Sequence, residues 1–108
     1  MMTDFKDRQR AEEAKFALDE DTAFRIVARR NRLLGLWAAE RMQLTPEETD
    51  AYAREVIHAE FEEGGDEAVI RKLLGDLTAA GVDMNEADLR TALEEQGVIA
   101  RRQLMSEN

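Results

Sequence analysis

The chain has 108 residues, which is enough for one domain with a modest hydrophobic core. It contains no cysteine, which excludes a disulfide framework and a thiolate metal site. Its net charge of −9 disfavours nucleic acid as a partner, because phosphates need compensating cations. The chain lacks an apolar run of membrane-spanning length and a hydrophobic signal segment at its start. We therefore expect a cytoplasmic protein that is not inserted in a membrane.

The charge is unevenly distributed along the chain. Residues 47–67 hold nine acids and one base, a net charge of −8, whereas residues 21–46 hold two acids and five bases, a net charge of +3. The simplest interpretation is charge complementarity between neighbouring helices.

Residues 1–18 have a helix-forming composition without Gly or Pro. Their apolar residues do not form a continuous stripe, since Phe5 and Phe16 share one side with Gln9 and Glu12 between them. Such a segment has little to bury against its own domain. We expect it to be loosely ordered when free and to fold on a partner; the alternative is a frayed extension of the next helix.

The next helix is predicted from about Asp21 to Met42, preceded by acids and a capping threonine at residues 19–22. On helical spacing, one apolar stripe contains Phe24, Val27, Ala28, Asn31, Leu34, Gly35, Ala38 and Met42. Ile26, Leu33 and Trp37 lie roughly opposite. A helix with two apolar faces is either surrounded or keeps one face for a partner, and we favour Trp37 as a core residue.

Local signals predict three further helices. Thr45, Pro46 and Glu48 form a capping box that starts the second helix, and Gly64-Gly65 ends it. Asp66 is expected to cap a third helix that Gly81 stops, and Asn85 to cap a fourth that bends or frays after Gly97. Their predicted core stripes contain Tyr52, Ala53, Val56 and Ile57, then Val69, Ile70, Leu73, Leu74 and Leu77, then Leu89, Ala92, Leu93, Gln96, Ala100 and Leu104.

Four helices with short connections and no strand pattern predict an all-α fold. We expect a single-domain four-helix bundle over residues 19–108, with neighbouring helices mostly antiparallel and a flexible N-terminal segment at residues 1–18.

The chemical signals for an enzyme are weak. Glu55 and His58 have the E-x-x-H spacing of di-iron bundles, but His58 is the only histidine and both residues point away from the apolar stripe. The acids around Gly64-Gly65 lack the ligand spacing of a calcium loop, and no activated nucleophile is evident. A metal-dependent enzyme is the least favoured hypothesis, and we expect neither a catalytic nor a metal site.

The arginines of the main helix are the remaining signal. Arg25, Arg29 and Arg32 lie on one side by helical spacing, with Arg30 swung away from them. They either pair with acids of the second helix or form a phosphate or nucleotide site, since a planar guanidinium suits phosphate oxygens. The candidate nucleotide-binding residues are Arg25, Arg29, Arg30, Arg32 and Trp37.

Residues 28–40, with the sequence ARRNRLLGLWAAE, resemble the hallmark of a known family. This is the zeta subunit, the ATPase inhibitor of F-type ATP synthase in alphaproteobacteria. The similarity spans nearly the whole chain and includes Leu44-Thr45, residues 61–67 and residues 79–83. Lys6 and Gln9 stand where the family commonly has acids. In the N-terminal segment the matching residues are Phe5, Arg8, Arg10, Ala11, Glu13, Ala14, Lys15 and Phe16.

The resemblance implies a regulatory subunit. Its N-terminal segment would enter a catalytic interface of the ATP synthase head, formed by the alpha, beta and gamma subunits, and act as a one-way pawl that stops hydrolysis more than synthesis. Phe5 and Phe16 would be apolar anchors, and Arg8, Arg10 and Lys15 would find carboxylates or carbonyls, with Ala14 in the same segment.

The resemblance also implies ADP or ATP as a regulatory ligand on the bundle, with no cofactor required. The protein would be a monomer when free, and peripheral at the inner face of the cytoplasmic membrane when bound to ATP synthase. The alternative function is an ADP/ATP-sensing bundle with little inhibition of its own.

Overall fold

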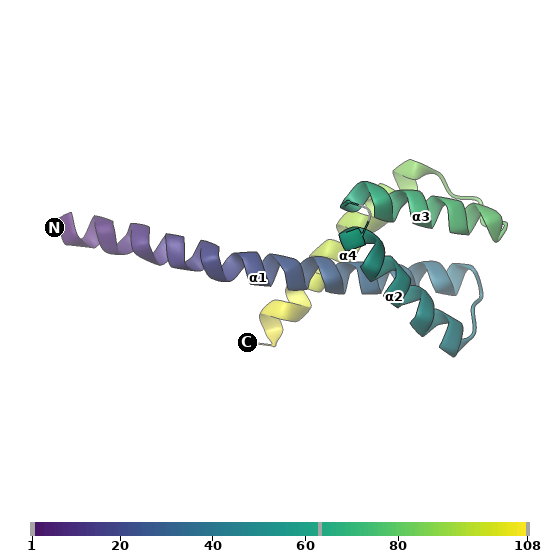
Figure 1. The fold of residues 1–108 in the computed structure, drawn as a ribbon, viewed down its shortest axis with the longest axis horizontal. Coiled ribbons are helices and arrows are strands. Elements are labelled where there is room, and N and C mark those ends of the chain that lie inside the picture. The colour runs from purple at the N-terminus through teal and green to yellow at the C-terminus, as the bar shows by residue number, and fades with distance from the viewer. Residues whose placement is uncertain (1, 63, 108) are drawn as a thin grey trace.

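Four helices joined by short connections form the described chain (Figure 1). The computed structural model describes the backbone of residues 2–62 and 64–107 and the side chains of residues 20–62 and 64–107. The helices are α1 (Met2–Arg41), α2 (Pro46–Glu62), α3 (Asp66–Ala79) and α4 (Glu86–Ser106). No strand occurs among these residues, which confirms the all-α prediction. None of the described helices is long and apolar enough to cross a membrane.

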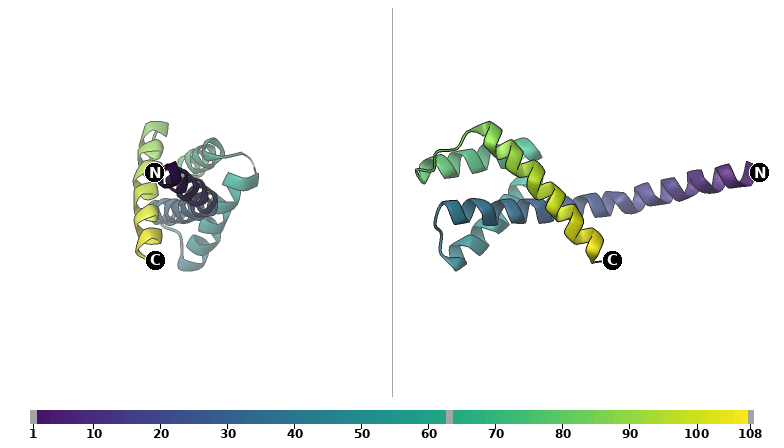
Figure 2. Two further views of the ribbon diagram at one scale, coloured as in Figure 1. Left: turned by 90° about the vertical axis from the view of Figure 1, so that its left-hand side faces the viewer. Right: turned by 180° about the vertical axis from the view of Figure 1, so that it is seen from behind.

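The first helix dominates the shape of the molecule. α1 has 40 residues, and its first half extends away from α2, α3 and α4 in Figure 1 and in the right-hand view of Figure 2, so that the longest dimension is 63 Å. The predicted start near Asp21 is therefore wrong, because the acids and threonine at residues 19–22 lie inside the helix. A capping residue marks the end of a helix only where the backbone leaves helical geometry. No Gly or Pro before Gly35 favours such a departure, so the helix continues through residues 19–22.

The other helix boundaries follow local signals. The backbone N–H of Thr45 donates to the Glu48 carboxylate (2.8 Å) and that of Glu48 donates to Thr45 Oγ1 (3.2 Å), which confirms the predicted capping box. Hydrogen bonds to the Glu48 carboxylate from the Thr45 backbone N–H and the Thr45 side chain lower the pKa of Glu48. Asn85 caps α4 in a second capping box with Asp88. The prediction for α3 is wrong, because its N-cap is Gly65, and the Asp66 carboxylate binds an arginine of α1 instead.

The core lies where α1 passes between its neighbours. The end-on view in Figure 2 shows α1 in the middle, with α4 on one side and α2 and α3 on the other. α1 therefore has other helices on both sides, and Trp37 is partly buried against the core as predicted. The buried core residues are Leu34, Ala38, Ala39, Tyr52, Val56, Ala59, Val69, Ile70, Leu73, Leu77, Leu89 and Ala92.

One residue of the predicted core lies at the surface. Phe24 is 54% exposed and stacks on the exposed Phe61 of α2, with ring centroids 4.6 Å apart. Its partner in the last turn of α2 is itself at the surface, so this contact leaves Phe24 largely open to solvent. The predicted fraying after Gly97 does not occur, because α4 continues to Ser106.

The closest approach of two helices occurs at Gly35. A Cβ atom on Gly35 would lie 2.6 Å from the Cα atom of Ala53, so the backbones of α1 and α2 touch there. Only glycine leaves room for this contact, and neighbouring Leu34 and Ala38 are fully buried beside it.

Gly35→Ala is expected to lower the free energy of unfolding by about 1–3 kcal/mol, because the added methyl group forces the backbones of α1 and α2 apart. Urea denaturation followed by circular dichroism measures the change. The matched control is Gly75→Ala in α3, where nothing lies within 4 Å of the added carbon. The control should gain up to about 1 kcal/mol from helix propensity. Equal changes in the free energy of unfolding for Gly35→Ala and Gly75→Ala would contradict the close packing of α1 against α2 at Gly35.

Candidate functional site

The structure separates the five residues predicted to bind a nucleotide. Arg25 is exposed and pairs with Asp21 one turn earlier (3.2 Å). Arg29 pairs with Glu107 after the end of α4 (2.7 Å). Trp37 holds the guanidinium of Arg41 over its ring, with the Arg41 Cζ atom 4.0 Å from the ring centroid. The structure therefore places the predicted residues in different surroundings, and of the five only Arg29 and Arg32 lie together.

Arg30 is the arginine that the fold encloses. Its Nη2 donates to Glu60 Oε1 (2.7 Å) and to Asp66 Oδ1 (2.8 Å), and its Nε donates to Asn31 Oδ1 (3.1 Å). Fully buried Asn31 also donates through Nδ2 to Glu60 Oε1 (3.0 Å). We call Arg30, Asn31, Glu60 and Asp66 the Arg30 cluster. It joins α1, α2 and α3, and the Arg30–Glu60 pair confirms for Arg30 the predicted pairing with acids of the second helix.

The two carboxylates of the Arg30 cluster differ in their electrostatics. Burial raises the pKa of Glu60 above its ordinary value, and nearby Asp66 adds to the rise, although Asn31 and Arg30 oppose it. Burial would also raise the pKa of Asp66, but the hydrogen bond and charge of Arg30 outweigh it, so the pKa of Asp66 is lowered. The Glu60 side chain is only 10% exposed and that of Asp66 is 49% exposed. The cluster is a structural ion-pair network, because its groups bind one another.

Gly97 of α4 lies beside this cluster. A Cβ atom on Gly97 would lie 3.5 Å from Cδ of Arg30, so the arginine side chain runs along the α4 backbone at this point. That distance is an ordinary van der Waals contact, so packing against Arg30 does not require glycine at this position.

Arg29 and Arg32, in contrast, lie together where α1 crosses the last turns of α4. They line an open cavity of about 450 Å³ with Leu33 of α1 and with Gln103, Ser106 and Glu107 at the end of the chain. Guanidinium and amide donors around an open cavity can bind phosphate oxygens. Sequence reasoning missed the partners from α4, because helical spacing within α1 does not show which helix packs beside its arginines.

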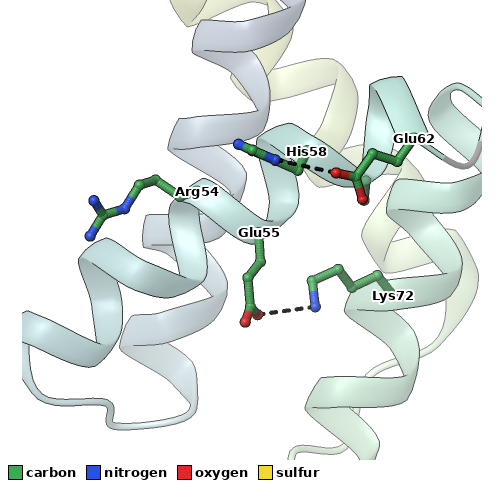
Figure 3. Close-up of a pocket in the computed structure, with 6 residues that line it drawn as sticks. Arg54, Glu55, His58, Glu62 and Lys72 are labelled. Atoms are coloured by element: carbon green, nitrogen blue, oxygen red, sulfur yellow. Dashed lines mark hydrogen bonds and ion pairs between the residues drawn. The ribbon is translucent and has the colours of Figure 1, made fainter.

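A second open cavity lies between α2 and α3 and contains the E-x-x-H pair (Figure 3). His58 Nδ1 lies 3.5 Å from Glu62 Oε1, and Lys72 Nζ lies 3.2 Å from Glu55 Oε2. Glu55 and His58 are exposed, as predicted, and Figure 3 shows each one turned toward a different partner. Among the described residues, no three His, Asp or Glu side chains are grouped so that they could hold a metal ion.

The residues of the predicted inhibitory segment lie on the projecting half of α1. The backbone is helical at Phe5, Arg8, Arg10, Ala14, Lys15 and Phe16. Their side chains lie outside the described residues. The helical backbone confirms the helix-forming composition of this segment, and its loose order in the free protein stays a prediction.

Two of three comparisons with known proteins find a match over most of the chain. The family model described as ATPase inhibitor subunit zeta matches residues 2–103. A solution NMR structure is 46% identical in sequence and has a TM-score of 0.68, and the match covers 79% of this chain and 96% of the other. No curated protein matches the chain. The four-helix fold is thus shared with a solved structure of similar sequence.

Arg30→Met is expected to lower the free energy of unfolding by about 2–4 kcal/mol, because it leaves Glu60 buried without its cation. The matched control is Arg54→Met in α2. It removes an exposed ion pair with Asp50, which is also in α2, and should lower the free energy of unfolding by less than about 1 kcal/mol. Chemical denaturation of both variants measures the difference. If the two losses are equal, the Arg30 cluster does not hold the helices together.

Carboxyl NMR titration should separate the two acids of the Arg30 cluster. Asp66 is expected to titrate below its ordinary 3.8 and Glu60 above its ordinary 4.5. Asp66 thus contributes stability that is lost as the pH falls through its lowered pKa, whereas the contribution of Glu60 is lost as the pH rises through its raised pKa. Arg30→Met should move the Asp66 midpoint upward. An unchanged midpoint would show that Arg30 does not set the pKa of Asp66.

Proposed function

Because the chain belongs to the ATPase inhibitor subunit zeta family, we propose that it inhibits ATP hydrolysis by F-type ATP synthase through residues 1–18. In this proposal the segment inserts into a catalytic interface of the synthase head, between its alpha, beta and gamma subunits. The protein is then a regulatory subunit without catalysis of its own, and acts on the cytoplasmic side of the membrane, where it is peripheral.

The observation that supports this mechanism most is the shape of α1. The helix is continuous from Met2, and its first half extends beyond the other three helices (Figure 1). At 1.5 Å per residue, residues 2–18 form a rod of about 25 Å. Every described core residue lies at Asn31 or later. The bundle therefore builds its described core without the projecting half, which is free to bind elsewhere.

The side chains of the segment suit insertion between protein subunits. Phe5 and Phe16 are eleven residues apart, which is about three helical turns, so they lie on one side of α1. Both would be buried as anchors on the head. Arg8, Arg10 and Lys15 would pair with carboxylates or carbonyls, and the small side chain of Ala14 would let the helix lie close to its partner. The continuous helix would transmit force from the inserted tip to the bundle, as a one-way pawl requires.

The proposed insertion predicts that inhibition depends on residues 1–18. The full-length protein should slow ATP hydrolysis by the matching synthase head, whereas a chain of residues 19–108 should not. In the full-length chain, Phe5→Ala with Phe16→Ala should weaken inhibition at least about 30-fold, the cost of losing an interface hot spot. A steady-state hydrolysis assay measures both.

Two checks accompany this test. Circular dichroism should show that the shortened chain keeps a cooperative thermal transition. Arg71→Ala on the exposed face of α3 is the matched full-length control and should inhibit like the unaltered protein. Equal inhibition by the full-length and shortened chains would refute the insertion mechanism.

A second candidate function rests on the cavity of Arg29 and Arg32. It would bind the phosphates of ADP or ATP as regulatory ligands, with Gln103 as an additional donor. This proposed site does not include Arg25, Arg30 or Trp37, which lie elsewhere on the molecule. A bundle that senses nucleotide in this way would need little inhibitory activity of its own.

ADP titration followed by amide NMR tests the second function. Binding should shift the signals of residues 103–107 and of Arg32, and Arg32→Ala should weaken it about tenfold, since one charge-assisted contact is lost. Arg25→Ala is the matched control and should leave the affinity unchanged. Shifts confined to the surroundings of Trp37 would contradict this location. ADP binding without inhibition of hydrolysis would favour the sensor over the inhibitor.

A further inference from the structure

The surface around the root of the projecting helix differs in charge from the rest of the molecule. Three open cavities surround the crossing of α1 with the last turns of α4. Two of them share Ile26 and two share Glu107, so they form one continuous surface, which we call the collar. Five arginines and three acids line it, a net charge of +2 on a chain whose net charge is −9.

Two arginines of the collar have no acidic partner among the described side chains. Neither Arg32 nor Arg101 forms an ion pair with any of them. Val98 and Met105 of α4 line the same cavities and are 49% and 64% exposed. Exposed apolar side chains among unpaired cations are typical of a surface that meets another protein.

The position of the collar connects it with the proposed inhibitory segment. Its first residue on α1 is Thr22, and residues 1–18 end four positions earlier, about 6 Å along the helix. α1 is unbroken between them. If all of residues 1–18 enter an opening on the partner, the rim of that opening must therefore lie against the collar.

We propose that the collar docks on the rim of that opening, an acidic surface of the ATP synthase head with apolar side chains among its carboxylates. This inference depends on the proposed insertion of residues 1–18. The arginines attract and orient the approaching protein, which raises the association rate, and Val98 and Met105 are buried once the helix is fully inserted. The collar also sets the depth of insertion, because the bundle is too wide to follow the helix.

The test compares full-length variants in time courses of ATP hydrolysis by the matching head. Arg32→Glu with Arg101→Glu should slow the onset of inhibition at least about tenfold at low salt, and the difference should shrink at high salt, where the charges are screened. The matched control is Arg71→Glu on α3, which lies outside the collar and should retain the original onset rate. Val98→Ser with Met105→Ser should mainly speed the release of the inhibitor.

The outcomes separate this inference from the proposed function. If Phe5→Ala with Phe16→Ala abolishes inhibition but the two collar variants behave like Arg71→Glu, insertion stands and the collar proposal is wrong. If the phenylalanine variant inhibits fully, insertion itself is wrong. Sedimentation analysis tests whether a second copy of the chain occupies the collar instead. A dimer of the unaltered protein that Arg32→Glu with Arg101→Glu dissolves would show that a second copy covers the collar, which also overturns the proposal.

Discussion

Arg30 is the side chain on which the arrangement of all four helices depends. It starts from α1, binds an acid at the end of α2 and another at the start of α3, and runs along the backbone of α4 at Gly97. An ion enclosed to this degree is unfavourable unless its charge and its hydrogen bonds are matched. Glu60, Asp66 and Asn31 provide that match. The arginine therefore constrains the helices to one geometry, while the apolar core supplies most of the free energy.

This arrangement divides α1 into two parts with different physical tasks. The second half is enclosed, with Gly35 against Ala53 on one side and α4 on the other. The first half extends from the bundle as a single helix (Figure 1). A rigid body with a helical arm suits a regulator that acts on a much larger partner, because the arm can be inserted while the body remains outside. Membership in an inhibitor subunit family fits that division.

The arginines of α1 illustrate how similar residues acquire different roles. Arg30 is enclosed and structural, whereas Arg29 and Arg32 face an open cavity with the end of α4. Arg25 is held by Asp21 one turn away. Helical spacing alone puts Arg25, Arg29 and Arg32 on one side, but it does not reveal which other helix approaches that side. The partner helix decides whether a guanidinium is a structural ion or a binding group.

The sequence by itself determined the features that depend on neighbouring residues. Thr45 with Glu48 and Asn85 with Asp88 start their helices through hydrogen bonds over three positions, and the apolar stripes of α2, α3 and α4 follow from the helical period. The family resemblance was readable in the same way and is confirmed over residues 2–103. Only the tertiary structure decided the features that depend on distant residues. Phe24 is exposed because its partner in α2, Phe61, is itself at the surface, and Asp66 leaves its capping role because Arg30 lies across from it. The start of α1 at Met2 also belongs to this second group. A capping residue ends a helix only where the surrounding structure lets the chain turn away from the helix axis.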